Sequence, residues 1–378
     1  MNTFEQLGLA APLLKALTAE GYTVPTPIQQ QAIPLVMAGR DVQGIAQTGT
    51  GKTAAFALPI IHRLLANPKP AQRRGCRVLV LSPTRELAGQ IAESFRSYGS
   101  QTNLRVALMF GGVPKPRQAK AVSSGVDVLV ATPGRLLDHM NDRAVDLGAT
   151  EVLVLDEADH MLDLGFIVPI RKIAATLPVV RQSLFFSATM PKEISGLAGA
   201  LLRDPAHVAV TPVATTADRV DQTVVFVEAS RKRILLASVL KRVGMERTLV
   251  FTRTKHGADR VVQHLEAAGI QARAIHGNKS QGQRERALAS FKDGTAPVLV
   301  ATDIAARGID VDGVSHVINF DLPNVPESYV HRIGRTARAG KAGKAISFCD
   351  SSERAHLRGI EKLIRTRVPV VEQEALAA

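Results

Sequence analysis

The sequence predicts an α/β protein with two domains, each built on a parallel sheet flanked by helices. The chain has 378 residues, which is enough for two domains of ordinary size. Short runs rich in Val, Leu and Ile, each followed by small or polar residues, recur in both halves and are typical of strands buried on both faces. Amphipathic stretches such as 257–268 alternate with these runs, and this alternation favours parallel sheets.

The expected strands fall into two sets separated by a region without a clear period. The first set covers 42–45, 78–81, 126–131, 152–155 and 183–186, and the second covers 248–251, 298–301, 317–320 and 345–348. The region 204–222 contains two prolines and an Ala-Thr-Thr-Ala run, so it is typical of a connection between domains. We therefore expect a first domain over 1–206, a flexible linker over 207–218, a second domain over 219–368 and a short tail over 369–378.

The amino-acid composition indicates which kind of partner the protein binds and in which cellular compartment it works. The formal net charge is +13, with the larger excess in the second half, which favours a polyanionic partner. The two cysteines, Cys76 and Cys349, provide neither a disulfide framework nor a zinc-binding cluster, so we expect a reducing, cytoplasmic setting. The sequence shows no signal peptide and no apolar run long enough for a membrane span, so no membrane partner is expected. With no Trp and three Tyr, aromatic stacking is not expected to be the main means of holding nucleobases.

Residues 46–53, Ala-Gln-Thr-Gly-Thr-Gly-Lys-Thr, lie between the expected strand 42–45 and an apolar stretch over 54–61. This order is typical of a phosphate-binding loop, because glycines let backbone N–H groups turn toward phosphate oxygens at a helix N-terminus. Lys52 is expected to reach the β and γ oxygens and Thr53 to ligate Mg²⁺. The nucleotide-binding residues predicted here are Thr48, Gly49, Thr50, Gly51, Lys52 and Thr53. Ala46 stands where the pattern has its first glycine, and a loop of small residues is the alternative.

An acidic quartet, Asp156-Glu157-Ala158-Asp159, directly follows the expected strand 152–155. Ligands of parallel sheets bind at the carboxyl ends of the strands. We expect Asp156 to hold Mg²⁺ directly or through water, and Glu157 to orient and deprotonate an attacking water. An acidic helix N-cap is the alternative for an isolated quartet, but its combination with a phosphate-binding loop favours catalysis.

The acidic quartet, the phosphate loop with Ala46 and the ordered motifs below together resemble the DEAD-box RNA helicases, over nearly the whole chain from Phe4 to Gly340. The stretch 276–281 is most similar to the bacterial RhlE-type group. The resemblance implies two RecA-like domains, ATP and Mg²⁺ as cofactors, and RNA as the partner. It also implies that RNA is bound through phosphates and 2′-hydroxyls independently of sequence, and that short duplexes are melted by bending one strand as the domains close.

The resemblance extends to a Q motif that ends at Gln29 and to the isolated aromatic Phe4 before it. An amide can pair with the N6/N7 edge of adenine, and Phe4 offers an apolar face to the ring, so both are predicted to bind the nucleotide and to favour ATP over GTP. A surface amide and a terminal core anchor are the respective alternatives.

Two loops of the first half and two hydroxyl residues complete its predicted sites. Stretches 83–88 and 132–135 each follow an expected strand and lead into a helix, and a pair of glycines at 111–112 allows close backbone approach. The predicted RNA-binding residues are Thr84, Arg85, Gly112, Thr132, Gly134 and Arg135. Helix capping with solvated arginines is the alternative. Ser187 and Thr189 resemble the family motif that couples the nucleotide site to strand separation, and an N-cap is the alternative there.

The second half carries the remaining motifs of the resemblance. Its predicted RNA-binding residues are Arg253, Lys279, Gln281, Arg284, Thr302 and Arg307, and its predicted nucleotide-binding residues are Gly308 and Asp310. For Asp303 and Asp310 the alternatives are helix caps and interdomain salt bridges.

The last motif contains Arg335 and Arg338, which are predicted to be catalytic. Three residues apart on a helix, they would point the same way toward one γ-phosphate, so hydrolysis would require the two domains to close. Ala337 replaces the glycine that the family usually has. A pair of exposed arginines on a solvated helix is the alternative.

Two other functions stay open from the sequence. A DNA translocase could use the same paired domains, and an ATP-gated RNA clamp could bind without turnover. The Q motif and the intact quartet disfavour the first, whereas Glu157, Arg335 and Arg338 disfavour the second. We expect a monomer, with ribosomal or RNA-decay complexes as candidate protein partners.

Overall fold

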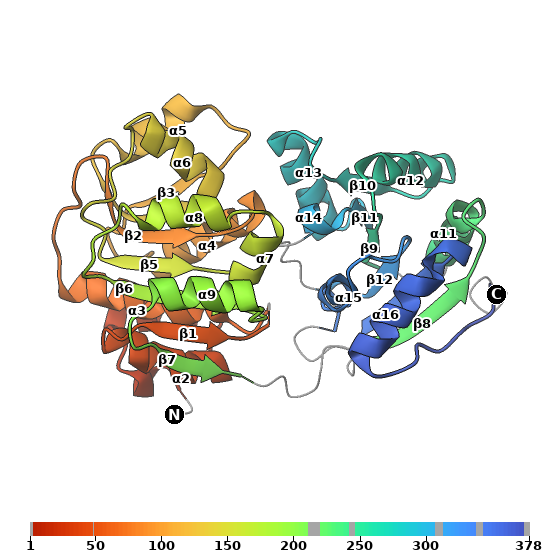
Figure 1. Cartoon of the computed structure of the whole chain (residues 1–378). Helices are drawn as coiled ribbons and strands as arrows, with labels where there is room; N and C mark the ends of the chain where they lie inside the picture. Colours follow the sequence, from red (N-terminus) through yellow and green to blue (C-terminus); the bar gives the residue numbers. More distant parts are fainter. Residues whose placement is uncertain are drawn as a thin grey trace. The chain divides into compact units, whose positions relative to one another are not determined.

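Two parallel sheets, one in each half of the chain, organise the computed structural model (Figure 1). The structure describes residues 3–47, 49–210, 220–241, 246–306, 313–337 and 343–373. The chain divides into two units, Met1–Thr211 and Pro212–Ala378, and each is described by itself.

The sheet of the first unit has seven described strands in the order β3-β4-β2-β5-β6-β1-β7, and every neighbouring pair is parallel. The strands are β1 (Val42–Ile45), β2 (Cys76–Leu81), β3 (Val106–Met109), β4 (Val126–Ala131), β5 (Val152–Leu155), β6 (Gln182–Ser187) and β7 (Ala206–Ala209). The central strands are buried on both faces, as their continuous apolar runs predict.

Helices cover both faces of this sheet. They are η1 (Glu5–Leu7), α1 (Ala11–Ala19), α2 (Pro27–Met37), α3 (Lys52–Ala66), α4 (Arg85–Tyr98), α5 (Lys115–Val122), α6 (Pro133–Asn141), α7 (Ala158–Asp163), α8 (Ile167–Ala174) and α9 (Lys192–Leu201). Alternate residues of β2 enter different cores: Val78 and Val80 pack with Phe56 of α3, whereas Leu79 packs with Leu136 of α6. This alternation fixes which way each strand faces and therefore where its following loop lies.

The second unit repeats the plan with six described strands in the order β10-β11-β9-β12-β13-β8, again all parallel. The strands are β8 (Val220–Phe226), β9 (Thr248–Phe251), β10 (Ala272–Ile275), β11 (Val298–Ala301), β12 (His316–Asn319) and β13 (Gly343–Cys349). The helices are α11 (Lys232–Leu240), α12 (Lys255–Ala267), α13 (Gln281–Lys292), α14 (Asp303–Ala306), α15 (Pro326–Ile333), η2 (Ser351–Glu353) and α16 (Arg354–Ile364).

The expected α/β class and each expected strand are confirmed, but β3, β7, β8 and β10 were not predicted from the sequence. All four are edge strands of their sheets and are only partly buried, and β7, β8 and β10 also carry polar residues. An edge strand needs no continuous apolar run, because one of its sides is left open, so the period that reveals a central strand is weak there.

Residues near two of the expected boundaries have defined contacts in the structure. The linker was expected from residue 207, but residues 207–209 belong to β7, which pairs with β1 through His207 and Gln43. The tail was expected from residue 369, but the N–H of Val224 donates to the carbonyl of Pro369 at 2.9 Å, and the N–H of Val371 donates to the carbonyl of Val224 at 2.9 Å. Pro205 contributed to the prediction that the domain ends near this position. Proline is nevertheless compatible with the position just before an edge strand.

Within the described residues, no helix has both the length and the apolar character that crossing a membrane would require.

Candidate functional site

Three of the predicted motifs meet because of the strand order of the first sheet. Strands β5, β6 and β1 are consecutive neighbours, and all three run in the same direction. The phosphate loop follows β1, the acidic quartet follows β5, and Ser187 ends β6. Their functional residues therefore lie together at the carboxyl edge of the sheet, where ligands of such sheets bind.

The phosphate loop has the backbone conformation that its glycines permit. Gly49 and Gly51 have φ values of +82° and +91°, in the left-handed region that favours glycine. Gly51 is the N-cap of α3 and has no side chain to cap the first N–H groups of the helix, which leaves them oriented for an anion. Lys52, in the first turn, is 6% exposed, and its Nζ donates to the carbonyl of Ala46 at 2.8 Å.

Gln29 contacts the phosphate loop, which differs from the expectation that its amide faces adenine. Its Nε2 donates to the carbonyl of Gly51 at 3.1 Å, and its Oε1 accepts from the N–H of Thr26 at 2.9 Å. Gln29 is 1% exposed, so the alternative of a surface amide is wrong. A side chain on Gly51 would collide with this amide, so Gln29 and Gly51 fit each other closely.

Phe4 is a core residue in this structure. It is buried with Leu7 and Leu13, and its ring meets that of Tyr22 edge to face at a centroid distance of 6.3 Å. Tyr22 in turn contacts Tyr98 of α4. This is the core anchor that the sequence left open as an alternative to an adenine contact.

The acidic quartet places two buried carboxylates beside the phosphate loop. Asp156 is 2% exposed, and burial raises its pKa to about 6, against the opposing charge of Lys52. Glu157 is the N-cap of α7 with φ +53°, an unusual backbone conformation for a residue other than glycine. One oxygen of Glu157 lies 3.3 Å from Nδ1 of His160. Such strained, buried carboxylates are typical of functional sites.

Ser187 and Thr189 both contact the last residue of the quartet, Asp159. The N–H of Asp159 donates to Oγ of Ser187 at 3.1 Å, while one oxygen of Asp159 accepts from the N–H and the hydroxyl of Thr189 at 3.0 and 2.9 Å. The hydroxyl of Ser187 donates to the carbonyl of Thr189 at 2.7 Å. The loop after β6 is thereby tied to the loop after β5, as a motif that links two sites would require.

These residues fit a nucleoside triphosphate with Mg²⁺. Backbone N–H groups, an ammonium group and a hydroxyl at a helix N-terminus match phosphate oxygens, and a hydroxyl with one carboxylate matches the oxygen ligands that Mg²⁺ prefers when phosphates supply the rest. Among the residues that the structure describes, no group of three or more His, Cys, Asp or Glu could hold a metal by itself. An ion at this edge would therefore depend on the nucleotide for most of its ligands.

The predicted RNA loops of the first unit lie on the other half of the sheet, after β2, β3 and β4. Thr84 is the N-cap of α4, and its hydroxyl oxygen accepts from the N–H of Leu87 at 3.3 Å. The guanidinium of Arg85 lies against Gly112, where any side chain would collide with it. The glycine at 112, which has φ +85°, makes room for Arg85 in this structure.

Thr132 and Arg135 have structural contacts at the start of α6, and Gly134 lies in its first turn. The N–H of Thr132 donates to the carbonyl of Met109 at 2.9 Å. Arg135 donates to the carbonyl of Val113 at 2.9 Å and to Oε1 of Gln118 at 3.1 Å. Its guanidinium holds the loop after β3 in place, so it is not a solvated charge as the capping alternative supposed.

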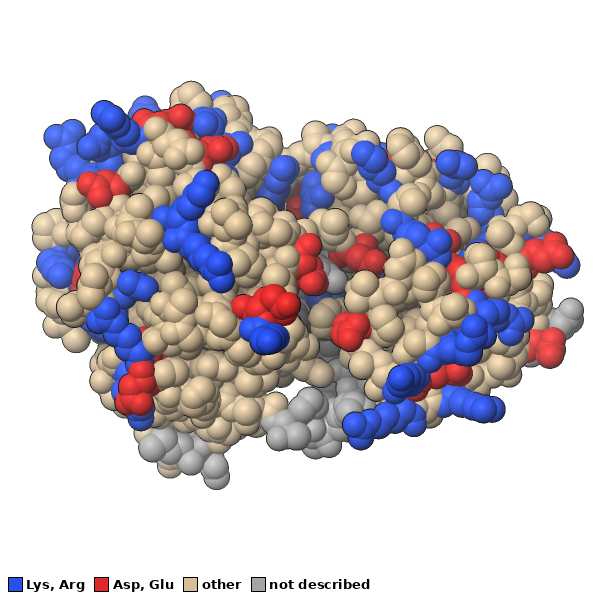
Figure 2. All heavy atoms as spheres, viewed as in Figure 1, with Lys and Arg blue, Asp and Glu red and all other residues tan. Residues whose placement is uncertain are grey.

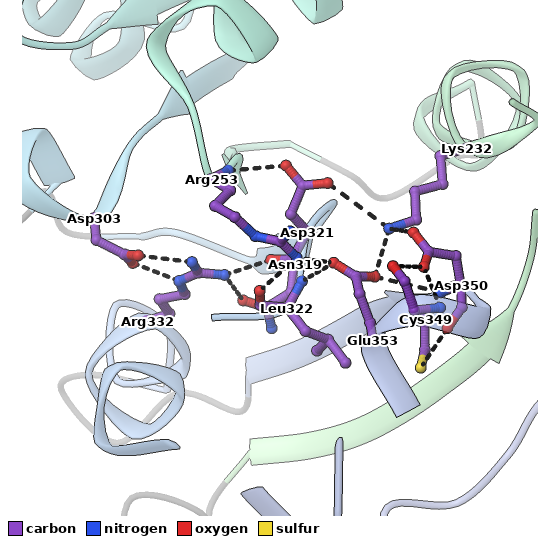
Figure 3. Close-up of polar contacts among 11 residues, drawn as sticks. Lys232, Arg253, Asp303, Asn319, Asp321, Leu322, Arg332, Cys349, Asp350 and Glu353 are labelled. Carbon is purple, nitrogen blue, oxygen red and sulfur yellow. Dashed lines mark hydrogen bonds and ion pairs between the residues drawn. The ribbon is translucent and has the colours of Figure 1, made fainter. Parts of the chain in front are cut away.

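In the second unit, the exposed Arg253 belongs to an ionic network centred on the buried Glu353 (Figure 3). Its guanidinium lies 2.5 Å from Glu353, and its N–H donates to Asp321 at 2.8 Å. Lys232, which is 2% exposed, contacts Glu353 at 2.6 Å and Asp350 at 3.0 Å. The pKa of Asp350 is held at about 2, because hydrogen bonds from Ser352 and Lys232 outweigh burial.

Lys232, Asp321 and Glu353 were not among the functional residues predicted from the sequence. Lys232 is one of three consecutive basic residues, and only the apolar face of α11 decides that the middle one turns inward. Glu353 lies 100 residues from Arg253 along the chain, so no local spacing could have revealed their contact.

The loop after β10 is held by Asp259 of α12. Asp259 contacts Nε2 of His276 at 3.0 Å and Nζ of Lys279 at 2.9 Å, and these partners hold its pKa below the usual range although burial opposes them. Arg284 is buried on α13, and its guanidinium donates to the carbonyl of His276 at 3.3 Å. Gln281 donates to Glu285 at 3.1 Å. The predicted RNA contacts here already have protein partners.

The motif around Arg335 differs from its expectation. Helix α15 ends at Ile333, and Ala337 has φ +55°, so Arg335 lies beyond the helix rather than on it. Arg335 is buried and its Nε donates to the carbonyl of His331 at 3.4 Å. Arg335 is therefore not on a helix, as the prediction assumed, while its predicted companion Arg338 lies outside the described residues.

Asp303 pairs with Arg332 inside the unit, rather than with the other domain. The two side chains form a bidentate contact at 2.5 and 2.8 Å, and Arg332 also donates to Asn319 at 3.1 Å (Figure 3). The carbonyl of Thr302 accepts from the N–H groups of Ala305 and Ala306, so Thr302 directly precedes α14 and accepts its first hydrogen bonds. Five predicted site residues lie outside the described residues: Thr48, Arg307, Gly308, Asp310 and Arg338.

Comparisons with known proteins agree with this geometry. The family model for "DEAD/DEAH box helicase" matches residues 26–197, and that for "Helicase conserved C-terminal domain" matches residues 230–340. The chain is 42% identical over 374 residues to the DEAD-box ATP-dependent RNA helicase CshA of Bacillus subtilis, which covers 99% of this chain and 75% of that protein. It is 44% identical over 365 residues to the ATP-dependent RNA helicase CshA of Limosilactobacillus reuteri, with 97% and 72% covered.

Solved structures show the same likeness. S. cerevisiae Dbp5 bound to RNA and ADP BeF3 is similar with a TM-score of 0.88 and 30% identity, over 100% of both chains. Mss116p bound to ssRNA and AMP-PNP is similar with a TM-score of 0.86 and 26% identity, over 98% of this chain and 78% of that one.

The raised pKa of Asp156 predicts how stability depends on pH without nucleotide or metal. The unfolded chain releases this proton near the ordinary Asp pKa of 3.8 and the native chain only near 6, so the free energy of unfolding should fall as pH rises between these values. Asp156→Asn should remove this fall and be more stable than the natural protein by about 1–3 kcal/mol at pH 7.5. Urea unfolding of both proteins from pH 4 to pH 7.5 measures the difference.

The matched control is Glu193→Gln, because Glu193 is an exposed carboxylate on α9. This control should keep the pH slope of the natural protein. If Asp156→Asn kept that slope as well, the carboxyl of Asp156 would not be the buried acid that the structure indicates.

Proposed function

Because this chain belongs to the family of DEAD-box ATP-dependent RNA helicases, we propose that it hydrolyses ATP when RNA is bound and thereby separates short RNA duplexes. The observation that carries the proposal is the meeting of Lys52, Asp156 and the Asp159–Thr189 contact at one edge of the first sheet. That arrangement supplies a phosphate site, a metal-binding carboxylate and a link to a second loop.

The proposed roles follow from the chemistry of the groups at this edge. Lys52 and the N–H groups at the start of α3 would bind the β and γ phosphates, while Thr53 and Asp156 would hold Mg²⁺. When bound, Mg²⁺ neutralises charge that develops on the phosphate oxygens. Glu157, the buried N-cap residue of α7 directly after Asp156, would orient the attacking water and accept its proton.

Adenine recognition by Gln29 and Phe4 stays a prediction, and it would require both side chains to give up contacts that they make in this structure. Gln29 already bonds to Gly51 and Thr26, so a contact with adenine would exchange the bond to the phosphate loop for one to the base. Phe4 would have to offer its ring from within the core. The resemblance to the Q motif supports the proposal that the nucleotide is ATP.

RNA binding is proposed to use loops of both units. In the first, Arg85 lies on glycine backbone after β3, and in the second, Lys279 and Thr302 follow neighbouring strands β10 and β11. Backbone N–H groups, hydroxyls and basic side chains bind phosphates without reading sequence. The similarity to Dbp5 and Mss116p, both solved with RNA, supports this part.

The catalytic roles of Arg335 and Arg338, and closure of the two domains during turnover, are supported by the family resemblance. Cytoplasmic location is supported by the cysteine content, and a monomeric state and ribosomal or RNA-decay partners stay predictions. The RhlE-type assignment also stays a prediction, since the two relatives described above carry the name CshA.

Steady-state ATP hydrolysis tests the proposal, measured without nucleic acid, with structured RNA and with DNA of matched sequence. We expect stimulation by RNA and not by DNA. Lys52→Ala should abolish ATP binding, while Glu157→Gln should keep binding and lose at least a hundredfold in turnover, as removal of a general base does.

Each rival function has its own outcome in that experiment. Equal stimulation by DNA would favour the DNA translocase, and RNA binding without turnover would favour the ATP-gated clamp. Full activity of Glu157→Gln would remove Glu157 from its role as the base.

The bond from Thr189 to Asp159 predicts a separate effect on coupling. Thr189→Val keeps the side-chain volume and removes the hydroxyl that donates at 2.9 Å, so ATP hydrolysis should change little while duplex separation per ATP falls at least tenfold. A fluorescent duplex-separation assay run alongside hydrolysis measures the ratio.

Thr18→Val is the control for that ratio, because the hydroxyl of Thr18 bonds only locally to the carbonyl of Leu14 on an exposed face of α1. This control should behave as the natural protein. Parallel loss of hydrolysis and separation in Thr189→Val would contradict a coupling role.

A further inference from the structure

The last helix of the second unit, α16, presents a row of basic side chains to solvent. Figure 2 shows this row as a blue stripe along the place that α16 occupies in Figure 1. The exposed basic residues are Arg354, Arg358 and Lys362 on the helix, and Arg365 and Arg367 directly after it. We refer to these five residues as the α16 stripe.

The geometry of the helix aligns the charges. Arg354, Arg358 and Lys362 are four residues apart, so their Cα atoms succeed each other by about 6 Å along one side of the helix. The opposite side is fixed in the core, where Leu357 and Ile360 pack with Tyr329 of α15. The stripe is therefore held facing outward on a rigid element.

The N-terminal end of the stripe, at Arg354, is also fixed by contacts within the unit. The guanidinium carbon of Arg354 lies 3.3 Å from the centre of the Phe226 ring on β8, a cation–π contact. The residue before it, Glu353, is buried against Lys232 and Arg253. The first turn of α16 is thus tied to β8, α11 and the loop after β9 of the same unit.

The charges of the stripe are not neutralised by the part of the chain that the structure describes. None of the five residues forms an ion pair with another described residue, in contrast to Arg253 and Arg332. The single acidic residue of α16, Glu361, accepts a hydrogen bond from the N–H of Val368 at 3.1 Å. The 14 residues from Arg354 to Arg367 therefore carry five basic side chains and one carboxylate, a net charge of +4, which creates a local positive potential that attracts a polyanion.

Most of the stripe lies away from the predicted RNA-binding loops of its own unit, and only its first residue, Arg354, adjoins one of them, because the preceding Glu353 contacts Arg253 of the loop after β9. Those loops follow β9, β10 and β11, at one end of the strand order. Helix α16 shares its core with β8 and β13, at the other end. A ligand on the stripe would therefore add contacts to those of the loops.

The chemistry of the stripe favours RNA over a protein. The core of a protein interface is apolar and depleted in charged residues, whereas the exposed face of α16 has Leu363 as its one large apolar side chain that is well exposed among the described residues. Phosphates of a nucleic-acid backbone need only aligned cations. The alternative is that the α16 stripe is a helix face that contacts only solvent.

We propose that the α16 stripe is an accessory RNA-binding surface, which holds the phosphate backbone of an RNA segment flanking the one acted on. The inference rests on the proposed function, because it assumes that RNA is the partner. It adds a site whose contribution should be independent of sequence, dependent on salt and limited to RNA long enough to reach it.

The test uses the full chain without nucleotide and compares RNA of about 8 nucleotides, the size of one binding site, with RNA of about 30 nucleotides. The triple variant Arg358→Gln, Lys362→Gln, Arg367→Gln removes charge at exposed positions. The matched control Lys15→Gln, Arg171→Gln, Lys172→Gln removes three exposed charges from the first unit. Thermal unfolding of both variants confirms that they fold.

We expect the stripe variant to lose at least tenfold in affinity for the long RNA at low salt, with the slope of log affinity against log salt reduced by about 2. Its affinity for the short RNA and its ATP hydrolysis with short RNA should match those of the control. An unchanged salt slope for the long RNA would overturn the proposal in favour of a solvated face or an acidic protein partner.

Equal losses for short and long RNA would overturn it as well, since the stripe would then belong to the main site. Failure of the proposed function is distinguishable, because it would show as absent ATP hydrolysis in the natural protein whatever the binding of the long RNA.

Discussion

The structure depends on one constraint: parallel strands β5, β6 and β1 are neighbours, so the loops that follow them share one edge. Each loop begins where a strand of the sheet ends, and the packing of apolar residues of these strands into the cores on both faces prevents the strands from slipping in register. The carboxylate of Asp156 is buried for this reason, because it directly follows a strand that is buried on both sides. Its raised pKa is the electrostatic cost of this position.

The other half of the same sheet, formed by β3, β4 and β2, is followed by loops that contain arginines and glycines instead of the acidic quartet. After β3, β4 and β2 come Gly112, Arg135 and Arg85, whose side chains and backbone support each other, and they lie beyond the acidic quartet in the strand order. Asp159 connects loops within the nucleotide half through Ser187 and Thr189. One sheet thus offers an anion site made of helix N-termini and glycines, and next to it a set of basic loops. The second unit repeats the basic loops and adds the ionic network around Glu353 (Figure 3).

Sequence reasoning succeeded where a feature depends on local order. A buried strand followed by glycines and Lys52, or by Asp156, is visible in the sequence because the strand, the loop and the helix are contiguous. It failed where a feature depends on distant contacts. Gln29 bonds to Gly51 rather than facing solvent, Arg253 bonds to Glu353, and Arg335 lies past a helix end that periodicity did not reveal. The edge strands β3 and β7 were not predicted for a related reason, since partial burial weakens the apolar pattern by which a strand is recognised.

The central claim is that nucleotide binding at the β5-β6-β1 edge is coupled to RNA binding. The most direct measurement is the dissociation constant of RNA with and without a non-hydrolysable ATP analogue, together with that of the analogue with and without RNA. The account predicts that the analogue tightens RNA binding at least tenfold and that RNA tightens analogue binding by the same factor, because coupling between two binding sites is reciprocal. RNA affinity that is the same with and without the analogue would contradict it.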